Sequence, residues 1–446
     1  MRRKWLCLFA LFIFFISTSQ IKAEPFALSI DDAIERALEQ SISLLRSEID
    51  LALSEYAASN LWSEIIPGFS LNAGMTILPS TPLFTDPGFT YNSDALSYNF
   101  TFGVSFTINP SVRASMERIE LAYRTQLLNY EAAKTQLEIQ VVREYLRLIT
   151  RWDYLTILEE NLEQSRERME LDRIARENGL LSELAWLNSQ LSVETARYNL
   201  SDARSSYRNA LEEFLFILGI DAGTEIIFFD DTDIVPRSFN AEQLILEHLP
   251  RRPDIIRHQQ NIHRLELGES ITTQNSRLPT LSFSTQWRGF SSPSSPMQRQ
   301  GLRDPFADSL SATISLSIPL DSWIPGTRQN QNIRSAAAEV EKARLDLENA
   351  ESAAGTRIRS LVSNLNNLNA SLEIAQLRVD IALRTVEATE DAFRNGTVSY
   401  RELEDRRRDL TDARQRLLDG EFQYRSLLLD LAAELNIDWR VLIRPI

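Results

Sequence analysis

The sequence predicts a mainly α-helical protein with a small β part, built as two similar halves. Three observations support this fold class. A short motif recurs in both halves, long stretches of the chain lack proline, and four segments alternate apolar with small polar residues. Long proline-free stretches favour helices, alternation favours strands, and an internal repeat sets the architecture of the whole chain.

The clearest sign of duplication is a five-residue motif. Residues 178–182 read Asn-Gly-Leu-Leu-Ser, and residues 395–399 read Asn-Gly-Thr-Val-Ser. We call these segments the first turn and the second turn. Their separation is far longer than a solenoid repeat, so each half must contain several elements. We therefore expect a first structural repeat over residues 24–236 and a second over residues 237–446, each with a helix, two strands and long helices.

The N-terminus has the three parts of a secretory signal peptide. Basic residues open the chain, an apolar run extends from Trp5 to Ile16, and small residues lead up to Ala23. We expect residues 1–23 to be the signal peptide. The alternative is an uncleaved membrane anchor, but the run is shorter than the roughly 20 residues that span a bilayer. The chain's one cysteine lies inside this run, so disulfides are not expected in the mature protein.

Composition excludes several classes of function. The formal net charge is −15, and because the expected signal peptide is basic, the mature chain is more acidic still. No nucleic-acid partner is expected, since such a partner needs a basic surface. His258 and His263 could contribute to a metal site but are better explained as surface residues. No nucleophile, metal set or phosphate-binding loop stands out, so we expect neither an enzyme nor a cofactor.

Two proline-free stretches, 111–235 and 326–444, predict long helices interrupted once each by a turn. A helix from about Arg113 to Glu177 would be on the order of 95 Å long. Apolar residues in the first stretch recur in steps of three, four and seven, which indicates a seam buried against neighbouring helices. The expected seam residues are Leu137, Val141, Tyr145, Leu148, Trp152, Leu155 and Leu162.

Shorter helices are expected to open each half. Ser29 can cap a first helix whose opening acids suit its positive end. The second copy is expected to begin near Asn240, to break at Pro250 and to restart at Pro253 in the sequence Arg-Pro-Asp. Proline is favoured in a first turn, where its missing N–H has no helical partner to lose.

Four segments of alternating residues predict strands: 69–77, 100–108, 281–288 and 312–318. One face of each would be apolar and the other small and polar, which is typical of a transmembrane β-barrel with a watery lumen. A soluble β-sandwich is the alternative. The expected lipid-facing residues are Phe69, Leu71, Phe100, Phe102, Val104, Phe106, Phe283, Trp287, Ile314 and Leu316.

Segments rich in proline, serine, aspartate and glycine join the strands of each pair, from Pro79 to Leu96 and from Ser291 to Ser309. We expect them to be loops at the outer surface. Four strands cannot enclose an aqueous channel, because about eight barely enclose packed side chains. Open strand edges cannot face lipid either. The chain is therefore expected to form a homotrimer with a 12-stranded barrel.

The order of elements resembles the outer-membrane efflux duct family of the TolC type over essentially the whole mature chain. The matching features are the two Asn-Gly-x-x-Ser turns, the Arg-Pro-Asp helix start, the Leu278-Pro279 exit into a strand and the signal peptide. The resemblance implies an outer-membrane β-barrel in contact with lipid, and an α-helical barrel through the periplasm of a Gram-negative-type bacterium. It implies an exit duct for tripartite efflux or type I secretion. The partners would be a periplasmic adaptor and an inner-membrane transporter of the RND, ABC or MFS type.

The resemblance also implies two sets of site residues. Adaptor tips would dock at Asn178, Gly179, Ser182, Asn395, Gly396 and Ser399, and the acids Glu402 and Asp405 would ring a periplasmic constriction. An ordinary solvated helix face is the alternative for these acids, because arginines follow them. The chain departs from the best-known members at the gate latch, where Val398 and Ala185 replace an arginine and an aspartate. How the tip is held shut is therefore open.

Two rival functions remain. One is a periplasmic coiled-coil adaptor or a structural protein of a transport complex; an adaptor should carry a single helical hairpin and separate compact β-domains. The other is a secreted enzyme or filament-like protein. Neither rival accounts for helix, strand and hairpin blocks that occur twice in the same order.

Overall fold

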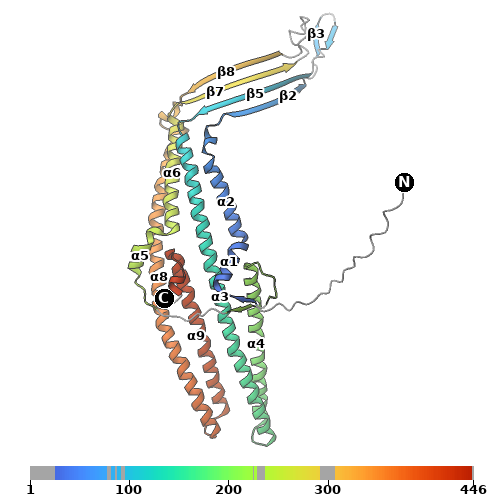
Figure 1. Cartoon of the computed structure of the whole chain (residues 1–446), viewed down its shortest axis with the longest axis vertical. Coiled ribbons are helices and arrows are strands. Elements are labelled where there is room, and N and C mark those ends of the chain that lie inside the picture. The colour runs from blue at the N-terminus through green and yellow to red at the C-terminus, as the bar shows by residue number, and fades with distance from the viewer. Residues whose placement is uncertain are drawn as a thin grey trace, which may run out of the picture.

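The computed structural model describes residues 26–77, 82–85, 88–91, 96–224, 226–228, 237–291 and 307–443. The described part is elongated, with a sheet at one end and the tips of two helical hairpins at the other (Figure 1). The expected signal peptide 1–23 and most of the expected loop 291–309 lie outside the described residues.

Two very long helices run from the sheet to the tips, and two shorter partners return from the tips about halfway (Figure 1). The long helices are α3 (Val112–Glu177) and α8 (Arg328–Arg394), and the returning helices are α4 (Glu183–Ile217) and α9 (Tyr400–Leu435). The pairs α3–α4 and α8–α9 form the first and second hairpins, and α3 also packs against α9. The duplicated long hairpins expected from the sequence are confirmed.

Shorter helices cover the half of the long helices that is nearer the sheet. They are α1 (Ile30–Gln40), α2 (Ile42–Ser59), α5 (Ala241–His248), α6 (Pro253–Arg277) and, near the C-terminus, α10 (Arg440–Ile443). The expected caps are present: the backbone N–H of Asp32 donates to Ser29 Oγ at 3.1 Å, and Asn240 caps α5. None of the described helices is apolar over a length that could cross a membrane.

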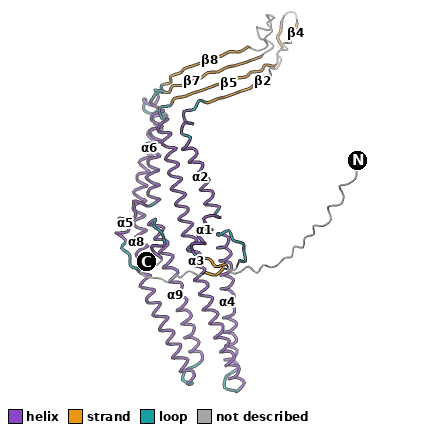
Figure 2. The backbone as a smooth tube through the Cα atoms, viewed as in Figure 1, coloured by secondary structure: helices purple, strands orange, loops and turns teal. Residues whose placement is uncertain are grey.

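The four expected strands form one antiparallel sheet in the order β2-β5-β7-β8 (Figure 2). Their bounds are β2 (Gly68–Ile77), β5 (Leu96–Ile108), β7 (Thr280–Ser291) and β8 (Ala307–Ser317). The pairing of β5 with β7 joins the two halves of the chain.

Two small sheets were not expected. β1 (Phe26–Leu28) pairs in parallel with β6 (Ile226–Phe228), far away in the sequence. β3 (Pro82–Thr85) and β4 (Gly88–Tyr91) form a short hairpin between β2 and β5. The prediction that Pro79 to Leu96 is only a loop was therefore incomplete, because strands of four residues are too short to show a periodicity.

The largest buried cluster lies at the level of the short sheet β1–β6, where α1, α3, α4 and α9 meet. Val141, Tyr145 and Leu148 are buried there as the seam predicted, and Tyr145 donates a hydrogen bond to the carbonyl oxygen of Leu28 at 2.9 Å. Trp152 corrects the prediction: its side chain is 55 % exposed and rests against Tyr207 at the surface. The heptad spacing continues through this position, but none of the described helices covers it.

A buried arginine connects α6 to the second hairpin. Arg252, the N-cap of α6, forms two hydrogen bonds with the Asp254 carboxylate, the shorter at 2.7 Å, and a further one with Glu434 on α9. Arg357 on α8 also pairs with Glu434, at 3.0 Å. Burial alone would raise the pKa of Asp254, but the hydrogen bonds and charge of Arg252 outweigh it and hold this pKa below its usual value.

Candidate functional site: the sheet faces and the hairpin tips

The strand register places the expected lipid-facing residues together. Directly opposed residues of an antiparallel pair point to the same face. Phe102 is opposite both Leu71 and Trp287, and Phe283 is opposite both Phe106 and Ile314. One face of the sheet therefore carries all ten: Phe69, Leu71, Phe100, Phe102, Val104, Phe106, Phe283, Trp287, Ile314 and Leu316.

This apolar face is uncovered in the single chain, with Leu71 and Ile314 each 74 % exposed. The opposite face carries mostly serine, threonine, asparagine and glycine. A Cβ on Gly103 would lie 2.9 Å from Ser70 Oγ, so the small residues of the polar face leave little room between neighbouring strands. A sheet with one greasy face and one small polar face is suited to separating lipid from water.

The sheet also has two open edges. β2 pairs only with β5, and β8 only with β7, among the described strands. The strands alternate in direction, so the two edge strands run in opposite directions. β8 of one copy could therefore continue the antiparallel pattern beside β2 of a second copy.

The first and second turns share one hydrogen-bond pattern. Each glycine follows the last helical residues with a left-handed backbone, φ +73° at Gly179 and +72° at Gly396. The N–H after each glycine donates five residues back at 2.8 or 2.9 Å, to Ala175 and Ala392 respectively. These bonds satisfy carbonyl groups at the helix ends, the role of glycine in a Schellman motif.

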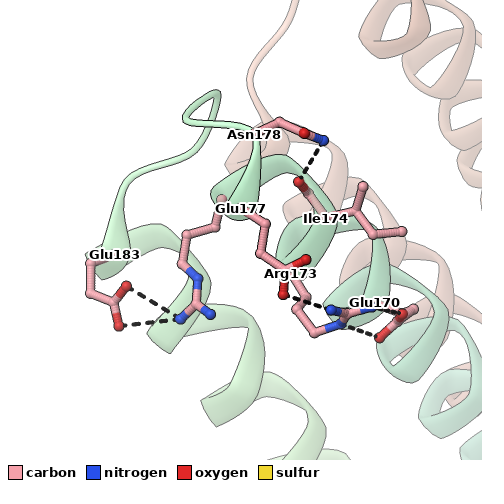
Figure 3. Close-up of polar contacts among 7 residues, drawn as sticks. Glu170, Arg173, Ile174, Glu177, Asn178 and Glu183 are labelled. Atoms are coloured by element: carbon pink, nitrogen blue, oxygen red, sulfur yellow. Dashed lines mark hydrogen bonds and ion pairs between the residues drawn. The ribbon is translucent and has the colours of Figure 1, made fainter.

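The motif's serine begins the returning helix. Ser182 Oγ accepts a hydrogen bond from the N–H of Ala185 at 3.2 Å, and Ser399 Oγ accepts one from Glu402 at 3.3 Å. Asn178 adds a side-chain hydrogen bond to the carbonyl of Ile174 at 3.0 Å (Figure 3). Asn395 occupies the matching C-cap position of α8. All six predicted tip residues therefore belong to two equivalent turns at the far end of the molecule (Figure 1).

The surfaces of the two tips differ. At the first turn, Glu183 pairs with Arg176 across the hairpin at 3.3 Å (Figure 3), while Leu180 and Leu184 are 81 % and 70 % exposed. At the second turn the exposed groups are polar, including an ion pair between Arg394 and Asp391. One tip thus presents leucines and the other presents charges.

Glu402 and Asp405 lie on the first two turns of α9, close to the second tip, and both are exposed. They are three residues apart and therefore share a helix face. Among the described residues neither forms an ion pair, whereas Arg406 pairs with Asp409 and Arg407 pairs with Glu390. These two arginines are therefore paired with other acids, and no ion pair of the described residues neutralises Glu402 or Asp405.

A buried contact between the two hairpins was not anticipated from the sequence. Arg168 of α3 is buried and pairs with Asp172 at 3.1 Å. Its guanidinium lies over the rings of Phe393 and Tyr400, which flank the second turn. We call these four residues the inter-hairpin contact. The only local signal was the i,i+4 spacing of Arg168 and Asp172, which many surface ion pairs share.

The two positions of the expected gate latch, Val398 and Ala185, take no part in the inter-hairpin contact. Val398 lies within the second turn and is half-buried, and Ala185 only donates its backbone N–H to the Ser182 cap. Arg168 and Asp172 lie on α3 about one to three helical turns before the first turn of the chain. Their contact with Phe393 and Tyr400 joins the first hairpin to the second.

Exposed apolar stripes follow several helices. On α4 the stripe is spaced by three, four and seven residues, and on α8 by three and four, which is coiled-coil spacing. Figure 1 shows α2 and α4 along one side of the molecule and α8 along the other. The stripe residues are Leu184, Leu187, Leu191 and Tyr198 on α4, Ile374, Leu377 and Ile381 on α8, and Ile42, Leu45, Ile49, Leu53 and Tyr56 on α2.

Solved structures of outer-membrane channels share this arrangement of a two-faced sheet above two long helical hairpins. CusC, whose crystal structures are described in terms of transmembrane channel formation, matches with a TM-score of 0.72 at 16 % identity, over 92 % of each chain. The CmeC outer membrane channel of Campylobacter jejuni matches with a TM-score of 0.72 at 15 % identity, over 91 % of this chain and 85 % of that one. The outer membrane protein VceC of Vibrio cholerae matches at 0.70 and 17 % identity, over 92 % and 96 %.

At these identities the structures show the fold. No curated protein sequence matches the chain. The profile of the outer membrane efflux protein family matches residues 33–220 and 245–436. The chain therefore belongs to the outer membrane efflux protein family, a family of transport channels and not of enzymes.

Proposed function

We propose that three copies of this chain form a continuous exit duct, with a 12-stranded β-barrel in the outer membrane and an α-helical barrel in the periplasm. The duct receives substrates from an inner-membrane transporter of the RND, ABC or MFS type through a periplasmic adaptor. It serves a tripartite efflux or type I secretion system. The observation that carries this proposal is the two-faced sheet, whose apolar face and open edges are both left uncovered by the single chain.

The sheet supports assembly of several copies. An apolar face this large is stable in water only when it is covered, and lipid covers it without further protein. Lipid cannot satisfy the open edges of β2 and β8, which need backbone partners. Pairing β8 with β2 of a neighbouring copy satisfies both edges. The barrel then closes when enough copies have joined, and three copies supply twelve strands.

The helices support the same assembly. The helices α2 and α4 lie on the opposite side of the molecule from α8 (Figure 1), and each of the three carries an exposed apolar stripe. Heptad-spaced apolar stripes bury themselves by packing against similar stripes. In a closed ring each copy presents one side to each neighbour, so the stripes on α2 and α4 and the stripe on α8 would all be covered at once. A periplasmic adaptor, the main rival, would have a single hairpin, whereas this chain has two.

In this proposal the two turns and the nearby acids lie at the periplasmic end of the duct, where the turns bind the adaptor and the acids line a constriction. The six residues of the two turns would dock the adaptor, with leucines offered at the first turn and polar groups at the second. Glu402 and Asp405 would point toward the axis, so that three copies place six carboxylates around a constriction. Such a ring favours cations over anions.

The experiment is a comparison of charge on the two sheet faces. Phe102→Arg and Ile314→Arg should each destabilise the barrel by about 2–4 kcal/mol near the bilayer midplane. Ser315→Arg is the matched control, since Ser315 lies beside Ile314 but on the polar face. We expect the control to yield a detergent-stable, heat-dissociable trimer in the outer-membrane fraction and the two lipid-face variants to yield little.

Equal amounts of trimer from all three variants would show that the apolar face does not meet lipid. A monomer in the soluble periplasmic fraction would show that the chain is not a membrane channel at all. Thr101, on the polar face, is not used as a control because its side chain is only 7 % exposed and an arginine there would clash with its neighbours.

A further inference from the structure

Arg288 is the only cationic residue in the four strands of the main sheet, all of whose residues are described. It lies on β7 opposite Thr101 of β5 and Ser309 of β8. These partners place it on the polar face of the sheet. Trp287, the preceding residue, is opposite Phe102 on the apolar face.

Along the strand direction, Arg288 lies at the same level as aromatic residues of the apolar face. Its partner Thr101 is flanked on β5 by Phe100 and Phe102, both of the apolar face. An arginine at membrane depth is strongly disfavoured unless it meets water or a partner, and for that reason marks a functional site more often than a structural one. Arg288 is exposed, and no ion pair involves it among the described residues. Its position therefore requires a water-filled space on the polar side of the sheet.

Arg288 also reaches further than its neighbours. Its polar-face partners on the neighbouring strands are small, among them Thr101, Ser309 and Ser311, and the adjacent polar-face positions on β7 itself are Gln286 and Phe290. A 12-stranded barrel is about 24 Å across between backbones, given strands about 4.8 Å apart and a tilt of about 40°. An extended guanidinium reaches roughly 6 Å inward, so its charge would lie about 6 Å from the axis, within a Debye length of about 8 Å at physiological salt.

We propose that Arg288 from three copies forms a cationic ring in the lumen of the β-barrel, which binds the phosphate-like oxyanion groups of solutes that pass through it. This inference rests on the proposed trimeric duct. Arginine suits the role because its planar fork of N–H donors matches oxyanions and keeps its charge at any physiological pH. Rings of arginine or lysine are the usual basis of anion preference in pores. The ring would lie near the outer mouth, at the opposite end of the duct from Glu402 and Asp405.

The test uses purified trimers in a planar bilayer, with inorganic tripolyphosphate as the probe on the side of the barrel mouth. We expect tripolyphosphate to block the wild-type current in a concentration-dependent manner. Arg288→Gln should weaken the block at least tenfold, and Arg288→Lys should retain most of it because the charge remains. The E402A/D405A double variant should leave the block from this side intact, since its acids lie at the other end.

A second variant guards against a failure of Arg288→Gln to assemble. Ser309→Asp keeps Arg288 but places a carboxylate directly opposite it on β8, and should weaken the block to a similar degree. Trimers that conduct normally but are blocked equally in wild type, Arg288→Gln and Ser309→Asp would overturn the cationic ring and leave the duct standing. Wild-type protein that forms no trimer and no conducting pore would overturn both proposals.

Discussion

The guanidinium carbon of Arg168 on α3 lies 3.9 Å from the ring centre of Tyr400, the first residue of α9. The same guanidinium lies 4.3 Å from the ring centre of Phe393, so the cation of one hairpin faces both aromatic rings at the tip of the other. Cation–π contacts of this kind gain strength as water is excluded. Burial, and then the nearby charge of Glu404, raises the pKa of Tyr400, so its phenol remains neutral at physiological pH.

The inter-hairpin contact should hold the two tips together. Arg168→Ala leaves the buried Asp172 carboxylate without its ion-pair partner, and breaking a buried pair in this way costs about 3 kcal/mol or more. We expect faster amide hydrogen exchange in the helical turns near both tips, and a higher conductance in planar bilayers because the tips separate more easily.

Arg394→Ala is the control for this prediction. Arg394 also lies at the second tip, but its ion pair with Asp391 is exposed, with side-chain exposures of 73 % and 75 %. Exposed pairs contribute about 0–1 kcal/mol. Equal exchange rates in the Arg168 and Arg394 variants would mean that the inter-hairpin contact does not couple the hairpins.

Gly179 and Gly396 are favoured at the two turns because of their left-handed backbone conformation, and not because a larger side chain would lack space. A Cβ at Gly179 or at Gly396 would meet no atom within 4 Å, so the whole penalty of an alanine comes from the left-handed φ. We expect Gly179→Ala and Gly396→Ala to destabilise their hairpins by a similar amount, about 1–2 kcal/mol each. Chemical denaturation in detergent, followed by circular dichroism, measures this effect.

At Gly268 we expect a substitution by alanine to have the opposite effect on stability. It lies inside α6 with ordinary helical geometry and also has no atom within 4 Å of a built Cβ. Gly268→Ala should therefore stabilise the protein by about 0.5–1 kcal/mol. A loss of stability in this variant, matching that of the turn variants, would show that space rather than backbone conformation limits these sites.

The acids near the second tip should govern ion preference. Replacing Glu402 and Asp405 with alanine removes like charges that no partner neutralises among the described residues, so the trimer should still fold. If these carboxylates surround the constriction, the double variant should lose cation preference and lose block by multivalent cations applied from the periplasmic side. Reversal potentials in a salt gradient measure the first effect, and current block measures the second.

A matched change on a different helix, α8, tests whether the effect is local to the start of α9. Glu339→Ala removes an exposed acid that pairs only with Lys342, far from either turn. It should leave both reversal potential and block as in the wild type. Unchanged selectivity in the Glu402 and Asp405 double variant would show that these acids face outward into solvent.

Asp254 should make stability depend on acid pH. Its folded-state pKa lies below the ordinary value of 3.8, so its contribution is present above that value and is lost as pH falls through the lower folded value. Asp254→Asn should therefore be less stable than wild type at pH 7, by about 1 kcal/mol because the carboxylate is partly exposed and solvent screens it. The difference should shrink below about pH 4.

Thermal melting in detergent between pH 3 and 7 measures this dependence. Asp50→Asn, at an exposed position on α2 that forms no ion pair among the described residues, is the control and should follow the wild-type curve. A stability difference between Asp254→Asn and wild type that stays constant down to pH 3 would show that Arg252 does not hold the Asp254 pKa low.

Several features of the fold could be predicted because their causes lie within a few residues of one another. The two turns need only a left-handed glycine and a capping serine, and both are visible in Asn-Gly-x-x-Ser. The strand faces follow from alternation, which assigned all ten apolar-face residues correctly to one side. Whether that side meets lipid and whether the turns dock an adaptor remain predictions.

The sequence by itself determined the duplicated hairpins, the turns between their helices and the two faces of each strand, because backbone hydrogen bonds and residue periodicity act over short distances along the chain. Only the tertiary structure decided which positions are covered. Trp152 continues the buried seam in spacing yet is exposed, since no helix in the part of the chain that the structure describes lies over it. The pairing of β1 with β6 and the meeting of Arg168 with Tyr400 depend on how distant segments rotate and align, and no local pattern records those relations.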